Sequence, residues 1–265
     1  MGRRPNSGLR ACEAVSVLAL LALGCATSGG ERGRSRALAA KKANSHFDLG
    51  VDHLENGRLA MALREFLNAE RLEPDDPRIQ YALGEAYLGK AKLAESEQHL
   101  LRALEFSPEY HDARLLLSTL YVHQERYEEA IVQSRQLAED PTFPGPWRAL
   151  TNLGWAQLQL GRAAEARQSL ELSRDYNAKY WPTLLDLGIL EMKEGHRLEA
   201  IELFRAALEQ RPGPGAEAEM NYHLGEIYVS LGKRERAIGH LRAAVARAPN
   251  GRWGKKSEEY LKLLR

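Results

Sequence analysis

The sequence predicts an all-α fold, a superhelical solenoid of six helix hairpins followed by a C-terminal capping helix. Apolar residues recur at helical spacing along the chain. A small residue preceded by leucine marks the first helix of each hairpin and returns after 34, 34, 36, 34 and 37 residues. A small residue in the second helix returns with identical steps. The first series is Gly50, Gly84, Ser118, Gly154, Gly188 and Gly225, and the second is Ala62, Ser96, Ala130, Ala166, Ala200 and Ala237.

The hairpin pattern is clearest between Trp181 and Pro214. Two apolar helical runs flank Gly195, which is expected to end the first helix, while Pro212 closes the second. A helix–turn–helix unit of about 34 residues is typical of the tetratricopeptide repeat, which these hairpins resemble in period and in pattern. The resemblance implies a tetratricopeptide-repeat superhelical solenoid.

The N-terminal residues 1–24 are predicted to be a lipoprotein signal peptide. Arg3, Arg4 and Arg10 precede an apolar run of 11 residues that ends at Gly24, too short for a membrane anchor of ~20 residues. Residues 21–25, LALGC, resemble a bacterial lipobox, and this resemblance implies that Cys25 carries a lipid. The alternative is an ordinary cleavable signal peptide with an incidental cysteine.

The remaining chain divides by composition and repeat register. Residues 25–42 are Gly/Ser-rich and polar at their start and are expected to form a flexible tether from Cys25. Three prolines in DPTFPGPW lengthen the third repeat and exclude helix there. The six repeats are assigned to residues 43–76, 77–110, 111–146, 147–180, 181–214 and 218–251, and the capping helix to residues 252–265.

Composition and motifs argue against an enzyme. The formal net charge of +1 excludes a strong general attraction to nucleic acid, and no basic stripe or aromatic-plus-basic module stands out as a nucleic-acid footprint. Eight histidines are dispersed over the repeats without metal-binding spacing, and no phosphate-binding glycine loop is present. We therefore expect no catalytic residue, metal, cofactor or small-molecule substrate, and a protein that acts by binding another protein.

In the tetratricopeptide family the first helix of each unit lines a concave groove, and that resemblance defines the candidate binding residues. They occupy the fifth and ninth places of the units and are largely apolar, with two acids. An apolar residue at such places can equally belong to the core between repeats. The candidates are Phe47, Val51, Tyr81, Glu85, Leu115, Trp155, Leu185, Ile189, Tyr222 and Glu226.

The lipobox, the GCATSGG start after it, the six repeats and the proline-rich break before NLGWAQLQLGR resemble the type IV pilus pilotins. These are outer-membrane lipoproteins needed for assembly of the pilus secretin. The resemblance implies a periplasm-facing protein that is lipid-anchored in the outer membrane and binds secretin subunits. Two other classes stay open: a general envelope adaptor for cell-wall enzymes or other envelope complexes, and a regulatory accessory subunit of an enzyme.

Overall fold

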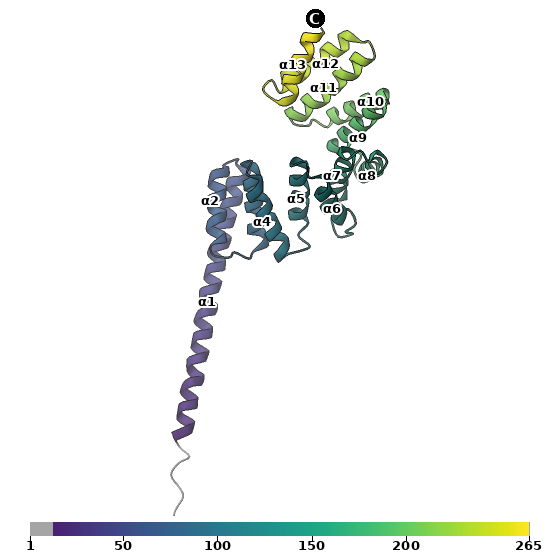
Figure 1. Ribbon diagram of the computed structural model, residues 1–265. Coiled ribbons are helices and arrows are strands. Elements are labelled where there is room, and N and C mark those ends of the chain that lie inside the picture. Colours follow the sequence, from purple (N-terminus) through teal and green to yellow (C-terminus); the bar gives the residue numbers. More distant parts are fainter. Residues whose placement is uncertain (1–12, 265) are drawn as a thin grey trace, which may run out of the picture. The chain divides into compact units, whose positions relative to one another are not determined.

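The computed structural model describes residues 13–264, with side chains from residue 33 onward. The basic start of the signal peptide, with Arg3, Arg4 and Arg10, lies outside these residues. Every regular element in the described part of the chain is an α-helix, and Figure 1 labels them from α1 to α13. The chain forms two compact units, residues 1–108 and residues 109–265.

The first unit contains two helix hairpins. Their helices are α1 (Glu13–Glu55), α2 (Leu59–Glu70), α3 (Pro77–Gly89) and α4 (Leu93–Phe106). Asp76 caps α3 because its carboxylate accepts a bond of 2.8 Å from the Arg78 amide, and Pro77 takes the first helical position. Phe66, Ile79 and Leu83 are almost completely buried between the hairpins. This apolar core places α1 and α3, the two first helices, next to each other.

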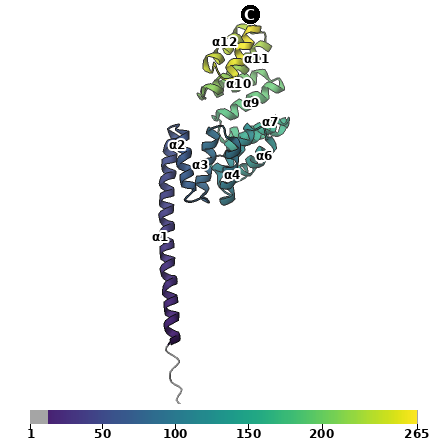
Figure 2. The same cartoon turned by 60° about the vertical axis from the view of Figure 1, so that its left-hand side comes forward.

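Helix α1 is much longer than the repeat register requires, and its N-terminal part extends beyond α2 and α3 (Figures 1 and 2). Residues 25–42, expected as a flexible tether, are helical here. The stretch from Arg36 to Ala43 consists of alanine, leucine, lysine and arginine, which are strong helix formers, so the first repeat helix continues backwards. Among the described residues, no helix combines the length and hydropathy that a membrane crossing requires.

The second unit contains four hairpins and a final helix. Its core includes Leu187, Leu190, Phe204, Leu224 and Tyr228, each exposed by 2% or less. The final helix packs against both helices of the last hairpin. The helices are α5 (His111–His123), α6 (Tyr127–Ala138), α7 (Pro146–Gln159), α8 (Ala163–Tyr176), α9 (Trp181–Glu194), α10 (Arg197–Glu209), α11 (Pro214–Ser230), α12 (Arg234–Arg247) and α13 (Arg252–Leu263).

Glycine is needed where the two helices of a hairpin approach each other. A Cβ atom on Gly188 would lie 2.6 Å from Cε1 of Phe204, and one on Gly84 would lie 2.7 Å from Cγ of Leu100. The third hairpin meets this requirement differently. Ser118 faces Ser134 instead of a large side chain, and their buried hydroxyls form a hydrogen bond of 2.6 Å. A serine therefore fits in place of glycine in the first helix because the residue opposite it in the second helix, Ser134, is also small.

A left-handed residue lies in the turn inside each hairpin. Gly195 has φ of +89° and ends α9, as predicted. Glycine is also left-handed at Gly57, Gly161 and Gly232. The second and third hairpins place Ala91 and Glu125 there instead, at φ of +56° and +59°. These two turns therefore adopt a backbone conformation that side chains with a Cβ atom disfavour.

Candidate functional site

In the first unit the candidate binding residues lie on the adjacent first helices α1 and α3. Phe47 is half-buried on α1, where its ring packs 5.9 Å from that of Phe66 and lies 5.4 Å below the guanidinium of Arg78. Arg78 also donates to Asn44 over 3.0 Å. The contacts of Arg78 hold α3 against α1. Val51, Tyr81 and Glu85 are likewise half-buried, so each retains some accessible area.

In the second unit, three of the candidates are core residues. Leu115 is 5% exposed and packs with Phe143, while Leu185 and Ile189 are 7% and 6% exposed in the main core cluster. Their assignment to an accessible surface is therefore corrected. The reason is that the neighbouring helices cover these places of α5 and α9. Trp155 on α7 is only partly buried and packs on the same core cluster as Ile189.

The last two candidates, Tyr222 and Glu226, belong to α11 and are engaged within the protein. The Tyr222 ring lies 5.0 Å from that of Trp253 and 6.3 Å from that of Tyr260, both on α13. Burial, together with the Glu226 carboxylate, raises the pKa of Tyr222 to about 12. Glu226 also accepts a bond of 2.9 Å from His223. The capping helix thus covers a place that the repeat pattern alone assigns to the binding surface.

Two acids that were not among the candidates are Asp186 on α9, which is buried, and Glu219 on α11, which is half-buried. Asp186 is 9% exposed, and in the described part of the chain it forms neither an ion pair nor a hydrogen bond. Burial raises the pKa of Asp186 well above its usual range, and the charge of Glu219 adds to this. Burial also raises the pKa of Glu219. Asn152 occupies the position of Asp186 one repeat earlier, and its amide donates to the hydroxyls of Ser118 and Thr119 in the repeat before it. In the repeat before Asp186, those two positions hold Gly154 and Trp155, which have no hydroxyl.

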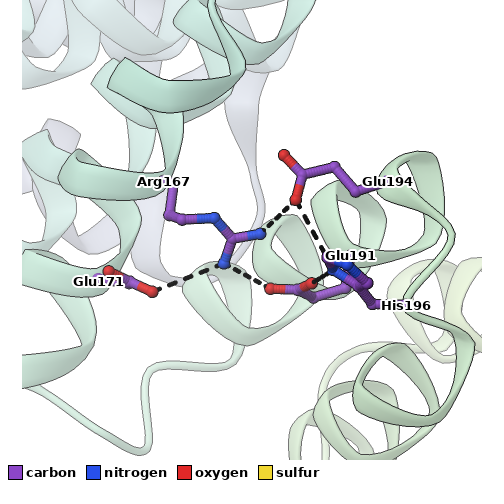
Figure 3. A network of polar contacts seen from close by, with 5 residues as sticks. All are labelled: Arg167, Glu171, Glu191, Glu194 and His196. Atoms are coloured by element: carbon purple, nitrogen blue, oxygen red, sulfur yellow. Dashed lines mark hydrogen bonds and ion pairs between the residues drawn. The ribbon is translucent and has the colours of Figure 1, made fainter.

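A charged cluster connects the fourth and fifth repeats (Figure 3). Arg167 on α8 donates over 2.6 Å to Glu191 and over 2.6 Å to Glu194, both on α9. His196 bonds to Glu191 over 2.7 Å. The bond from Arg167 lowers the pKa of Glu191, and the two carboxylates raise the pKa of Arg167. The repeat pattern did not reveal this cluster, because the pattern rests on apolar and small residues whereas the cluster joins charged residues of two repeats.

The carboxylates of Glu191 and Glu194 and the His196 ring approach one another closely enough to hold a metal ion, since their ligand atoms lie within 4.8 Å. The guanidinium of Arg167, however, already bonds to both carboxylates. A metal ion would have to displace this cation. The cluster therefore acts as an ion-paired link between neighbouring repeats.

The proline-rich segment before α7 borders a hollow of about 250 Å³ in the second unit. Asp140 accepts bonds from Thr142 and from His111, at 2.7 Å and 2.8 Å, and these donors lower the pKa of Asp140 to about 2. The extra length of the third repeat therefore forms an ordered turn. The lining residues are His111, Asp112, Phe143, Pro144, Gly145, Trp147 and Arg148.

Within each unit, two-helix hairpins stack so that their first helices lie next to each other, an arrangement that helical-repeat proteins use to bind partners. The tetratricopeptide repeat model matches residues 47–111, 92–142, 135–177 and 185–252. The chain therefore belongs to the tetratricopeptide repeat family, as its period predicted.

Two relatives align in sequence with about three quarters of this chain. The type IV pilus assembly protein PilF of Pseudomonas aeruginosa is 25% identical over 198 residues, which cover 72% of this chain and 76% of PilF. The rat DnaJ homolog subfamily C member 3 is 27% identical over 217 residues, covering 76% of this chain but 42% of the relative. The resemblance to the type IV pilus proteins is thus confirmed in sequence.

Solved structures show the same fold. The structure of Pseudomonas aeruginosa PilF aligns with a TM-score of 0.68 and 18% identity, covering 85% of this chain and 99% of PilF. The structure of PilW, described as a widely conserved type IV pilus biogenesis factor, aligns with a TM-score of 0.70 and 18% identity. That alignment covers 81% of this chain and 97% of PilW.

Proposed function

We propose that the chain is a type IV pilus biogenesis lipoprotein that is anchored in the outer membrane through Cys25, faces the periplasm and binds secretin subunits. The observation that carries the proposal is the similarity to PilF, which spans about three quarters of both chains. The lipobox-like LALGC supplies the anchor, and the repeats supply surfaces for a protein partner. The role is to bring the partner to the membrane and support its assembly.

The surface that we assign to the partner is the one shared by α1 and α3. Phe47, Val51, Tyr81 and Glu85 remain partly accessible there, whereas most candidates of the second unit are buried or covered by α13. Aromatic side chains beside an arginine are the composition of many binding hot spots. In the second unit, Trp155 and Glu226 also remain partly accessible.

The anchor is tested by replacing Cys25 with alanine in cells that make pili. We expect the variant to leave the membrane fraction, and secretin subunits to remain unassembled. Acyl groups on Cys25 should be visible in the mass of the wild-type N-terminal peptide. Normal secretin multimers in the variant would contradict the role, and recovery of cell-wall enzymes as the main partners would favour the general envelope adaptor.

The binding surface is tested with Phe47→Glu combined with Tyr81→Glu. The matched control is Val132→Glu combined with Leu198→Glu, because these side chains are 52% and 65% exposed on the second helices α6 and α10. Co-purification with the secretin should be lost only in the first pair, while circular dichroism shows the same helicity for both. Retained binding by the first pair would place the site elsewhere.

A further inference from the structure

The stretch of α1 that precedes the first hairpin is strongly basic and exposed. The charged residues with described side chains are Arg34, Arg36, Lys41 and Lys42. Glu31 and Arg32 precede them on the helix, and residues 32–47 contain no acid. All four side chains are exposed, and among the described residues none forms a hydrogen bond or an ion pair. Figures 1 and 2 show this part of α1 extending clear of α2 and α3. Four exposed cations therefore lie together on one projecting helix.

Three of these cations share a face with an exposed leucine. With about 100° between successive residues of a helix, Arg34, Lys41 and Lys42 lie within about 60° of Leu38. Leu38 is 55% exposed. Arg36 lies about 160° away from Leu38, on the other side of the helix. We call Arg34, Leu38, Lys41 and Lys42 the basic face of α1.

The basic face points away from the core of the first unit. Ala43 and Phe47 pack against that core, and on the helix they lie about 140° and about 180° from Leu38. Asp48 and Asp52 follow further along α1 and end the basic stretch. The exposed surface is thus limited to the part of the helix that lies nearest to Cys25 in sequence.

We propose that the basic face of α1 lies on the surface of an anionic phospholipid bilayer. Lysine and arginine near such a surface contribute about 1 kcal/mol each, and an exposed leucine adds apolar area that the headgroup region can bury. Glu31 lies about 20° from Leu38 on this face, but Arg34, Lys41 and Lys42 leave the face net positive, and this charge selects an anionic partner. Continuity with the anchor selects a lipid surface, because Cys25 lies on the same helix about 14 Å from Arg34 along its axis.

The inference extends the proposed function from one membrane attachment to two. A protein held by one weak membrane contact binds the membrane reversibly. A basic surface beside a lipid anchor is a common second contact that makes membrane binding stable. The contact would also fix the direction in which α1 leaves the membrane. It depends on the proposed function only for the anchor that holds the helix near the lipid.

The experiment uses the mature chain, residues 25–265, with Cys25→Ser so that no acyl group contributes. Its sedimentation is measured with vesicles of phosphatidylcholine alone and with equal parts of phosphatidylcholine and phosphatidylglycerol. We expect binding only to the anionic vesicles, and weaker binding at high salt because salt screens the attraction. The variant with Arg34→Gln, Lys41→Gln and Lys42→Gln should bind about 100-fold more weakly.

Two controls distinguish a specific effect of the basic face from the effect of removing positive charge anywhere on the protein. Arg36→Gln removes a neighbouring cation on the opposite side of the helix and should change the affinity less than any single replacement on the basic face. Arg242→Gln, Lys255→Gln and Lys262→Gln together remove three exposed cations from α12 and α13. This triple variant should bind like the parent chain, and circular dichroism should show equal helicity throughout.

Equal binding to both vesicle types would overturn the proposal, as would an unchanged affinity of the basic-face variant. The proposal would also be overturned if a control variant lost as much vesicle affinity as the basic-face variant. Soluble polyglutamate that binds the chain as tightly as the vesicles do would show an acidic-protein surface instead. The anchor is judged separately, from the acyl mass on Cys25 of the protein isolated from membranes, so either idea can fail without the other.

Discussion

Replacing Gly188 with alanine tests the close approach of the two helices in the fifth hairpin. The new Cβ atom would lie 2.6 Å from Cε1, 2.8 Å from Cδ1 and 3.1 Å from Cζ of Phe204. The optimal van der Waals separation between non-bonded carbon atoms is about 3.5–4.0 Å. The Phe204 ring is 0% exposed, so it has to retreat by roughly 1 Å into a packed core.

Two opposing effects set the expected magnitude. Overpacking of a core costs typically ~1–3 kcal/mol. Alanine, in turn, favours the helix over glycine by about 1 kcal/mol. The net expectation for Gly188→Ala is therefore a loss of up to about 2 kcal/mol in the free energy of unfolding.

Gly239→Ala on α12 is the matched control. A Cβ atom there meets nothing within 4 Å, so this variant gains helix propensity without a clash and should be stabilised by about 1 kcal/mol. Urea unfolding followed by far-ultraviolet circular dichroism measures both variants. The difference between them isolates the packing effect.

A double mutant identifies the clashing partner. Phe204→Ala removes the ring, so in that background Gly188→Ala should stabilise the protein as Gly239→Ala does. The reasoning would be refuted if Gly188→Ala raised the free energy of unfolding of the otherwise unchanged protein as much as Gly239→Ala. It would also be refuted if the effect of Gly188→Ala were the same with and without the Phe204 ring.

Glu125→Gly should raise the free energy of unfolding by about 1 kcal/mol, because glycine accepts φ of +59° without the Cβ strain. The reciprocal change Gly161→Ala, at φ of +77°, should lower it by a similar amount in urea unfolding, and a loss of stability in Glu125→Gly would contradict this. Asp186→Asn should stabilise the protein by roughly 1–3 kcal/mol at neutral pH, since it removes a buried, unpaired charge. The folded-state pKa of Asp186 is raised, so its cost is absent below the ordinary aspartate pKa of about 4 and grows as pH rises through the folded value. The gain should therefore shrink on acidification in pH-dependent urea unfolding, and a gain independent of pH would contradict the assignment.

The hairpins were predictable because they are local. Gly195 ends its helix through its own backbone freedom, and the leucine–glycine pairs repeat at a spacing that only stacked hairpins explain. These signals lie within some 34 residues of one another. They fix the fold class without any knowledge of long-range contacts.

The candidate site was less predictable because accessibility depends on what covers a residue. The repeat place of Tyr222 assigns it to the binding surface, but Trp253 and Tyr260 of the capping helix pack against it. Leu185 occupies the same place as Phe47 yet belongs to a core. Asp186 gave no signal in sequence, since a lone aspartate in a helix is normally solvated.

The matched pairs at the helix crossings have a consequence for how such arrays can grow. Gly188 is complementary to Phe204 and Ser118 is complementary to Ser134, although the backbones repeat. Recombination that exchanged single helices between repeats would join a hydroxyl to a phenyl ring, or leave a void beside glycine. Duplication of whole hairpins avoids both outcomes, so the heritable module of this chain is the helix pair.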